Sequence, residues 1–502
     1  MLTPTPLPTI IALARAGALD HAWAQFCAAG YDAIDDDPAA LTVKGRLLKD
    51  YALRSQGEER RRYYLKSSEA YRRAASLRPA TYPLINAATL SLLAGDRAQA
   101  EEIAREVLDR IAREPEEPET PYWRAATEAE ALLLLGRLEE ARRAIYEAVD
   151  AAPDAWEDHA STLRQFLLIQ AELGRETAWL DRLRPKRSVH YAADADRDVT
   201  ADQRGAVERF LDRENVGFAY GGLAAGPELV AAEALLAAGA QLNVVLAGDA
   251  SSFAAGFVDP FGPDWRRRFD SALEAAASVY EVRPLRTPPD PEMINIARLI
   301  SRGDALIHAD RLLGEVVPLP LGPAGVGPQD DGDDGGGGSQ PGRLPLALVA
   351  LGAGSGAEQG FADRLGRIQA VLGSGGGPTI SPHLSGDCIL IGYATPAQAA
   401  GVARRLHAQL AASVPLRIAA HFGLISAVRD PFTGAIRPTE SGAAIASAIA
   451  ASMPPDTICV SRDFAAVLAA DAGRAGDAGW IGELAAFDGG SAIGLYALSR
   501  QA

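Results

Sequence analysis

The sequence has little cysteine and no long apolar run, and both shortages limit what the protein can be. Only three cysteines, Cys27, Cys388 and Cys459, occur among 502 residues, and no two form a CxxC pair. This spacing argues against a disulfide framework or a thiolate metal site and suits a reducing compartment, so we expect a cytoplasmic protein. No stretch of roughly 18 or more apolar residues is present, and the first residues lack the pattern of a secretory signal.

The chain is also short of positive charge. Asp and Glu number 65 against 49 Lys and Arg, which gives a formal net charge of −16. An acidic surface repels phosphate backbones and anionic lipid headgroups, so we expect neither nucleic acid nor a membrane as a partner. The seven histidines form no HExxH pair, and neither a GxSxG elbow nor a Walker GxxxxGK motif occurs. Zinc-protease, α/β-hydrolase and P-loop chemistry are therefore not expected.

The length exceeds the ~250–300 residues that one core usually serves, so we expect several domains. Residues 1–185 predict an all-α domain, because Leu, Ala and Arg dominate and apolar residues recur at helical spacing. A glycine followed by small or apolar residues five and nine places later occurs three times. The three copies are Gly17, Ala22 and Phe26; Gly95, Ala100 and Ala104; and Gly136, Ala141 and Ile145. This repeat predicts glycines that end one helix and small residues that line the inner face of the next.

The third copy, LGRLEEARRAIYEAVDAAP, resembles the second half of a tetratricopeptide repeat. The stretches KGRLLKDYALRS and AYRRAASLRPATYPLINAATLSLLAGD also resemble the TRAF-binding helical region of MAP3 kinases and their bacterial homologues. These resemblances imply a domain that binds a protein partner and does no chemistry. A plain helical bundle is the alternative.

Residues 186–321 predict a Rossmann-like α/β domain. The run VGFAYGGLAAGPELVAAEALLAAGAQLNVVLAG reads as strand, glycine-rich turn, helix and strand, which is a βαβ unit of a parallel sheet. Amide groups at Gly221, Gly222 and Gly226, with the following helix N-terminus, suit a phosphate; a purely structural turn is the alternative. The arrangement resembles the SLOG/LOG-type Rossmannoid superfamily and so implies a nucleotide-type ligand. Glu228, in the first helical turn, would repel a phosphate if it pointed inward.

The Gly-, Pro- and Asp-rich residues 322–343 predict a flexible linker. Residues 344–502 then predict an α+β domain in the order β-α-β-β-α-β-α-β-α-β-β. This order and the phrases SGDCILIGY, RIAAHFGLI, DPFTG, PPDTICVSRDFAAVLAA and IGELAAF resemble the ferredoxin-like domain of class III adenylate and guanylate cyclases.

In that family two aspartates hold two Mg²⁺ or Mn²⁺ ions, an asparagine and an arginine stabilise the transition state, and a lysine and a second polar residue read the purine. Only the second aspartate position, Asp387, keeps its residue here. The first aspartate position, the two purine-reading positions, and the asparagine and arginine positions fall respectively at Leu351, His383, Arg437, Ala444 and Ala448. One carboxylate cannot hold a two-metal site. The resemblance therefore implies a degenerate cyclase domain, with no catalytic residue assigned and Mg²⁺ or Mn²⁺ needed only if it is active.

The sequence thus predicts a multidomain regulatory or scaffold protein. The helical repeats would bind a partner, the middle domain would sense a nucleotide-type ligand, and the cyclase-like domain would form a homodimer or a mixed pair. Two enzymatic alternatives stay open: an active cyclase with atypical residues, in which Asp387 binds metal, and a nucleotide-processing enzyme that uses the Gly221–Gly226 loop.

Overall fold

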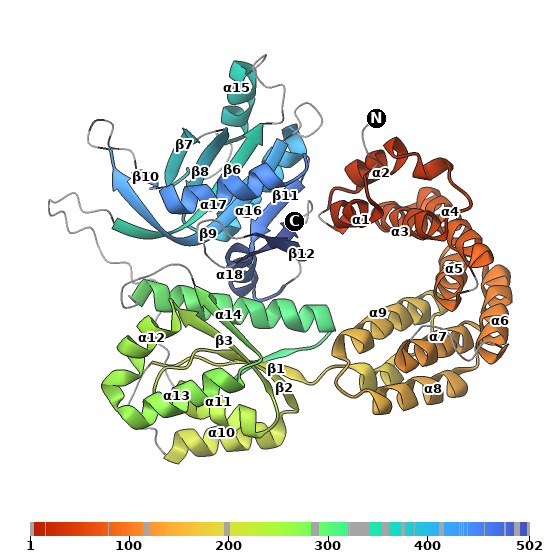
Figure 1. The fold of residues 1–502 in the computed structure, drawn as a ribbon, viewed down its shortest axis with the longest axis horizontal. Helices are drawn as coiled ribbons and strands as arrows, with labels where there is room; N and C mark the ends of the chain where they lie inside the picture. Colours follow the sequence, from red (N-terminus) through yellow and green to blue (C-terminus); the bar gives the residue numbers. More distant parts are fainter. Residues whose placement is uncertain are drawn as a thin grey trace. The chain divides into compact units, whose positions relative to one another are not determined.

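Two compact units make up the structure, a computed structural model (Figure 1). A helical unit comprises Met1–Pro185 with Arg311–Leu313, and a two-sheet unit comprises Lys186–Asp310 with Gly314–Ala502. The structure describes residues 5–15, 17–78, 80–113, 120–194, 201–282, 291–319, 321, 342–353, 361–372, 377–385, 387–410, 416–430, 432, 434, 436–438, 440–455, 457–475, 478–485 and 492–498.

The helical unit consists of consecutive α-helices, most of them arranged as antiparallel neighbours. They are α1 (Leu7–Arg15), α2 (Leu19–Ala28), α3 (Pro38–Arg54), α4 (Gly57–Leu77), α5 (Thr81–Leu93), α6 (Arg97–Arg113), α7 (Pro121–Leu134), α8 (Leu138–Ala151) and α9 (Trp156–Leu173), with short 3₁₀ turns at Tyr31–Ala33 and Ala178–Leu183. Local signals set several starts. The side chain of Asp37 accepts a hydrogen bond from the amide of Ala39, and that of Thr120 from the amide of Trp123.

The predicted repeat is confirmed in the helical unit. Gly17, Gly95 and Gly136 each adopt a positive φ, of 83°, 81° and 77°, in the turn between two helices. A left-handed turn of this kind favours glycine because it has no Cβ. The residues five and nine places later in each copy are all buried. Each glycine therefore ends one helix so that the next can pack its small-residue face inward.

The first sheet of the two-sheet unit is parallel throughout. Its strand order is β4-β3-β2-β1-β5. The strands are β1 (Arg187–His190), β2 (Val216–Gly221), β3 (Gln241–Ala247), β4 (Ser278–Val282) and β5 (Val316–Pro318), and the helices are α10 (Ala201–Arg213), α11 (Pro227–Ala237), α12 (Ala250–Phe257), α13 (Pro263–Ala275) and α14 (Pro291–Leu312). As predicted, β2, α11 and β3 form a βαβ unit. The order reverses between β1 and β5, and the carboxyl ends of strands at such a switch point are where ligands of open α/β sheets usually bind.

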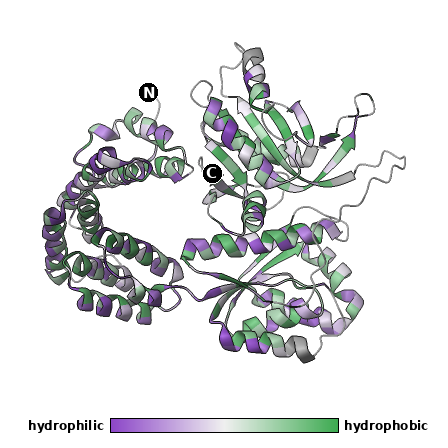
Figure 2. Ribbon diagram, turned by 180° about the vertical axis from the view of Figure 1, so that it is seen from behind, coloured by the Kyte–Doolittle hydropathy of each residue, from purple (hydrophilic) through white to green (hydrophobic). Residues whose placement is uncertain are grey.

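The second sheet has the order β12-β13-β11-β9-β6-β8-β7, with β10 paired to β9. Its elements are β6 (Gly342–Ala353), α15 (Phe361–Leu372), β7 (Ile380–Ser385), β8 (Cys388–Tyr393), α16 (Pro396–Leu410), β9 (Leu416–Arg429), β10 (Ile436–Pro438), α17 (Glu440–Ser452), β11 (Thr457–Ser461), α18 (Arg462–Ala472), β12 (Ala478–Leu484) and β13 (Ile493–Leu498). This is the predicted order with one added strand, β10. Hydrophobic residues follow the strands of both sheets (Figure 2). The predicted linker at 322–343 lies outside the described residues, apart from Gly342 and Arg343 at the start of β6.

The two sheets share one buried apolar cluster, which includes residues of α14 and α18. A Cβ built on Gly303 of α14 would overlap the carbonyl oxygen of Ala466 in α18, so only glycine allows this approach. Beside it, the Arg462 guanidinium donates to Asp304 at 2.7 Å and lies 3.8 Å from the ring centroid of Tyr280. Packing and a paired charge thus hold the sheets together. No helix in the described ranges is both long enough and apolar enough to cross a membrane.

Gly303→Ala should therefore destabilise the chain, because the added methyl group meets backbone that cannot rotate away. Overpacking of this kind costs about 1–3 kcal/mol. Gly366 in α15 is the matched control: nothing lies within 4 Å of an added Cβ, so Gly366→Ala should stabilise the helix by about 0.5–1 kcal/mol. Urea unfolding of both variants measures the difference, and equal effects would contradict the close helix contact.

Candidate functional site

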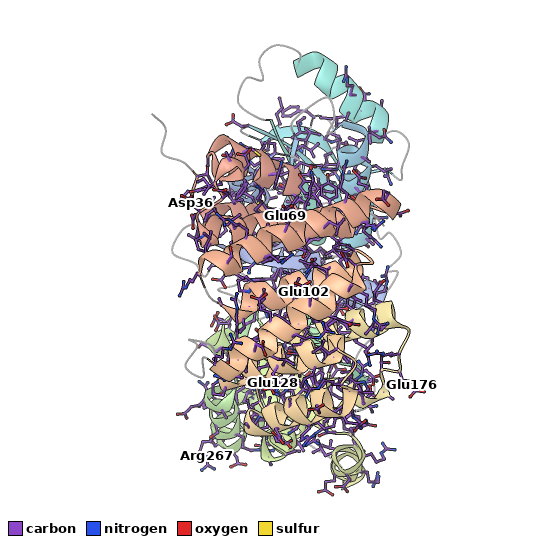
Figure 3. The ribbon with its side chains drawn as sticks, turned by 90° about the vertical axis from the view of Figure 1, so that its right-hand side faces the viewer. Asp36, Glu69, Glu102, Glu128, Glu176 and Arg267 are labelled. Atoms are coloured by element: carbon purple, nitrogen blue, oxygen red, sulfur yellow. The ribbon has the colours of Figure 1, made fainter. Side chains whose placement is uncertain are left out.

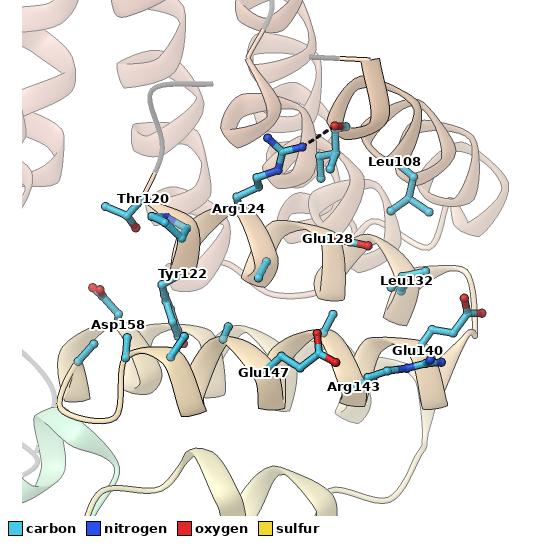
Figure 4. A pocket seen from close by; sticks show the side chains of 18 of the residues that line it. Leu108, Thr120, Tyr122, Arg124, Glu128, Leu132, Glu140, Arg143, Glu147 and Asp158 are labelled. Carbon is cyan, nitrogen blue, oxygen red and sulfur yellow. Dashed lines mark hydrogen bonds between the residues drawn. The ribbon is translucent and has the colours of Figure 1, made fainter. Parts of the chain in front are cut away.

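A groove of about 1050 Å³ lies in the helical unit (Figure 4). It lies between the end of α6, helices α7 and α8, and the start of α9. Alanine and leucine side chains form part of its wall, and Arg124, Glu128, Arg143, Glu147 and Asp158 bring charges of both signs to it. This mixture of apolar and charged side chains suits a polypeptide segment.

The surface of the repeats carries exposed acidic side chains. Figure 3 shows exposed carboxylates at Asp36, Glu69, Glu102 and Glu176 on one side of the helical unit. Several arginines near the groove are already engaged with protein atoms. Arg124 donates to the carbonyl of Ile111 at 2.6 Å, for example.

The predicted glycine loop lies at the carboxyl end of β2, beside the switch point of the parallel sheet. A Cβ on Gly221 would overlap the ring of Tyr191, and a Cβ on Gly222 would overlap the carboxylate of Glu228. Gly226 adopts a φ of 100° directly before α11. The three glycines thus have structural reasons to be there: two allow a close approach of side chains, and one permits a left-handed turn.

The Glu228 carboxylate points inward and is bound by backbone amides of the loop. It accepts hydrogen bonds from the amides of Ala224 and Ala193, both at 3.0 Å, and so ties the loop after β2 to the loop after β1. Burial raises the pKa of Glu228, although these two hydrogen bonds oppose the shift. In this conformation the two amides are not available to a phosphate.

Arg298 of α14 completes this arrangement. Its guanidinium donates to the carbonyl of Ala193 at 2.6 Å and to the carboxylate of Asp194 at 2.8 Å. The arginines of α13 are also paired. Arg266 binds Asp259 and Asp270, Arg267 binds Asp264, and Arg268 binds Glu233.

In the second sheet, the two candidate metal-binding positions differ sharply. Leu351 is 2% exposed and belongs to the apolar cluster beneath α16 and α18. Asp387 is exposed in the turn between β7 and β8. Within the described ranges, no three His, Cys, Asp or Glu side chains come together in a way that could hold a metal ion.

The other candidate cyclase positions are spread over the domain. Arg437 of β10 is bound to Asp430 at 3.1 Å, and His383 of β7 contacts the carbonyl of Ser381 at 3.2 Å. Ala444 and Ala448 lie on α17, which packs with other side chains on the apolar cluster opposite to that of Leu351. One copy of the sheet therefore does not bring Leu351 and the two alanines to the same face.

Residues 9–91 match the Tetratricopeptide Repeats-Sensor (TPR-S) family. The match runs from α1 into α5 and includes the first glycine copy of the repeat. It supports the assignment of tetratricopeptide-type helical repeats, which generally mediate protein interactions. No curated protein matches the sequence.

Several solved nucleotidyl cyclases are similar to about a third of the chain. An adenylate/guanylate cyclase/hydrolase from Silicibacter pomeroyi is 19% identical over 32% of this chain and 99% of its own, with a TM-score of 0.26. An adenylate cyclase from Trypanosoma brucei, solved in its monomeric state, is 13% identical over 31% of this chain and 90% of its own, with a TM-score of 0.25. The adenylyl cyclase CyaB from P. aeruginosa is 12% identical over 32% and 95%, also at 0.25. The likeness is weak and establishes no function.

The titration of Glu228 gives a testable pH dependence. Because its folded-state pKa is raised, the folded chain holds the proton more tightly than the unfolded chain. Its contribution to stability is therefore full at low pH and is lost as the pH rises through the folded-state pKa. Measured against Glu228→Gln, the wild-type free energy of unfolding should fall as the pH is raised from acid to neutral. Both proteins contain the other buried carboxyls, so the contributions of those groups cancel in the comparison. If the unfolding free energy of the wild type minus that of the variant stays constant or grows as the pH rises, the buried position of Glu228 is refuted.

Proposed function

We propose that this chain is a regulatory protein that binds partners and has no nucleotidyl cyclase activity. The observation that carries the proposal is the buried Leu351. Where the cyclase resemblance requires a metal-binding carboxylate, the chain has an apolar side chain packed in the core. A single carboxylate, Asp387, does not supply the several oxygen ligands that a divalent cation needs.

The helical unit supplies the partner-binding surface in this proposal. The TPR-S match and the confirmed glycine repeat support it, and so does the groove of Figure 4. Its alanine-lined wall and its charges of both signs favour a polypeptide segment with both apolar and charged side chains.

The cyclase-like sheet serves as a pairing module, with a second copy or with an intact cyclase. Large apolar side chains at the carboxyl end of β9 support this role: Val428 of β9 is 41% exposed, and Phe432 in the β9–β10 loop is 96% exposed. Exposed apolar side chains that gather in one region of a surface commonly mark an interaction site.

A nucleotide-type ligand at Gly221, Gly222 and Gly226 is also part of the proposal, with one physical condition. The Glu228 carboxylate occupies the amides of Ala193 and Ala224, so a phosphate would have to displace it or bind other donors. No feature of the loop favours nucleotide processing over binding.

Purified full-length protein given ATP or GTP with Mn²⁺ should release no cyclic nucleotide above a protein-free blank. Asp387→Ala should give the same result, because the metal site is incomplete before that change. An intact cyclase assayed in parallel shows that the conditions support turnover. Product from the wild type that disappears in Asp387→Ala would overturn the proposal.

A further inference from the structure

Three charged side chains on one face of α3 lack partners. Arg46, Lys49 and Asp50 follow the i, i+3, i+4 spacing that places residues side by side on a helix. All three are half-buried, yet within the described residues none of their side chains makes a hydrogen bond or an ion pair. Their charges act on the pKa values of Lys49 and Asp50, although no hydrogen bond or ion pair joins the three side chains.

A tyrosine of α4, Tyr71, packs against α3 next to these charged residues. Tyr71 is 3% exposed, and a Cβ on Gly45 of α3 would lie 2.7 Å from its ring, so glycine leaves room for the ring to pack there. Its hydroxyl has no hydrogen-bond partner among the described residues, and Arg46 and Asp50 are among the charges that act on it.

Glu130 of α7 faces this group from across the repeats. Its Oε1 accepts hydrogen bonds from Thr89 of α5 at 2.5 Å and from Gln165 of α9 at 3.0 Å. Its second oxygen has no donor within the described part of the chain. Lys49 and Glu130 act on each other's ionisation but form no ion pair. Burial lowers the pKa of Lys49 and raises that of Glu130, which opposes the charged form of each.

An arrangement of this kind is costly to the protein alone. Half-buried charged side chains without protein partners lose part of their hydration and gain no ion pair in exchange, which destabilises the folded state. Arg462 and Asp304, paired at 2.7 Å, show the alternative, in which two charged groups satisfy each other. A ligand that brings complementary groups would recover much of the lost interaction.

We propose that Arg46, Lys49, Asp50, Tyr71 and Glu130, the α3 cluster, bind a small organic anion that also carries hydrogen-bond donors. The two cationic side chains of α3 suit a phosphate or carboxylate group. Asp50 and the free oxygen of Glu130 suit amino or hydroxyl groups of the same molecule. The inference is independent of the proposed function: the α3 cluster shares no residue with the groove of Figure 4 or with the second sheet.

The chain offers a direct probe, because it contains only four lysines: Lys44, Lys49, Lys66 and Lys186. Native full-length protein is acetylated with and without millimolar adenosine 5′-monophosphate, inorganic phosphate or adenosine, and each lysine is quantified by mass spectrometry. Adenosine monophosphate should slow the acetylation of Lys49 at least severalfold and leave the exposed Lys66 unchanged. Protection by inorganic phosphate as well would show that the anion alone is sufficient.

Adenosine lacks the anion and should not protect Lys49. Protection by adenosine equal to that by the monophosphate would overturn the role of the cationic side chains. Absence of Lys49-specific protection with both phosphate compounds would overturn the site itself.

Two methionine variants separate binding from folding. Lys49→Met should weaken adenosine monophosphate binding, measured by calorimetry, by about tenfold or more, which corresponds to about 1.4 kcal/mol. It should raise the melting temperature of the ligand-free protein, because it removes a half-buried charge that has no partner. Lys66→Met should change neither quantity. If Lys49→Met lowers the melting temperature and leaves the affinity unchanged, Lys49 has a structural role and the inference fails.

Discussion

A charged group that is removed from water destabilises the fold unless it has a partner. The charged groups of this chain meet this constraint in different ways. In the two-sheet unit two charged groups, Glu228 and Arg462, have partners within the unit. Glu228 takes two loop amides, and Arg462 pairs with Asp304 where α14 crosses α18. In the helical unit Lys49 and Asp50 are left without partners. This contrast separates polar groups that hold the fold together from those that are available to bind.

The same contrast explains why recognition is assigned to the helical unit. The loop at Gly221–Gly226 is filled by a side chain of its own domain, and Leu351 is part of an apolar core. The repeats, in contrast, contain an open groove and the α3 cluster. The two sheets share an apolar core and a helix contact that requires glycine. A change in the packing of one sheet therefore affects the packing of the other.

The sequence predicts the features that depend on local rules. A glycine at a helix end and a small residue five places later require only neighbouring residues, so the repeat at Gly17, Gly95 and Gly136 is visible. The strand and helix order of the second sheet follows from periodicity, except for β10, whose three residues are too few to show alternation. The inward position of Glu228 is not visible, because it depends on amides from two separate loops. The α3 cluster is hidden for the same reason: Lys49 and Glu130 are far apart in the sequence, and nothing near either predicts the other.

Hydrogen–deuterium exchange of the full-length chain with and without adenosine 5′-monophosphate reports on every segment at once and so locates the bound ligand. We predict slower exchange in peptides from α3, α4 and α7, where the unpartnered charges of the helical unit lie. Unchanged exchange in these peptides, with protection confined to the β2–α11 loop, would contradict this prediction, because the nucleotide would then bind only where it must displace Glu228.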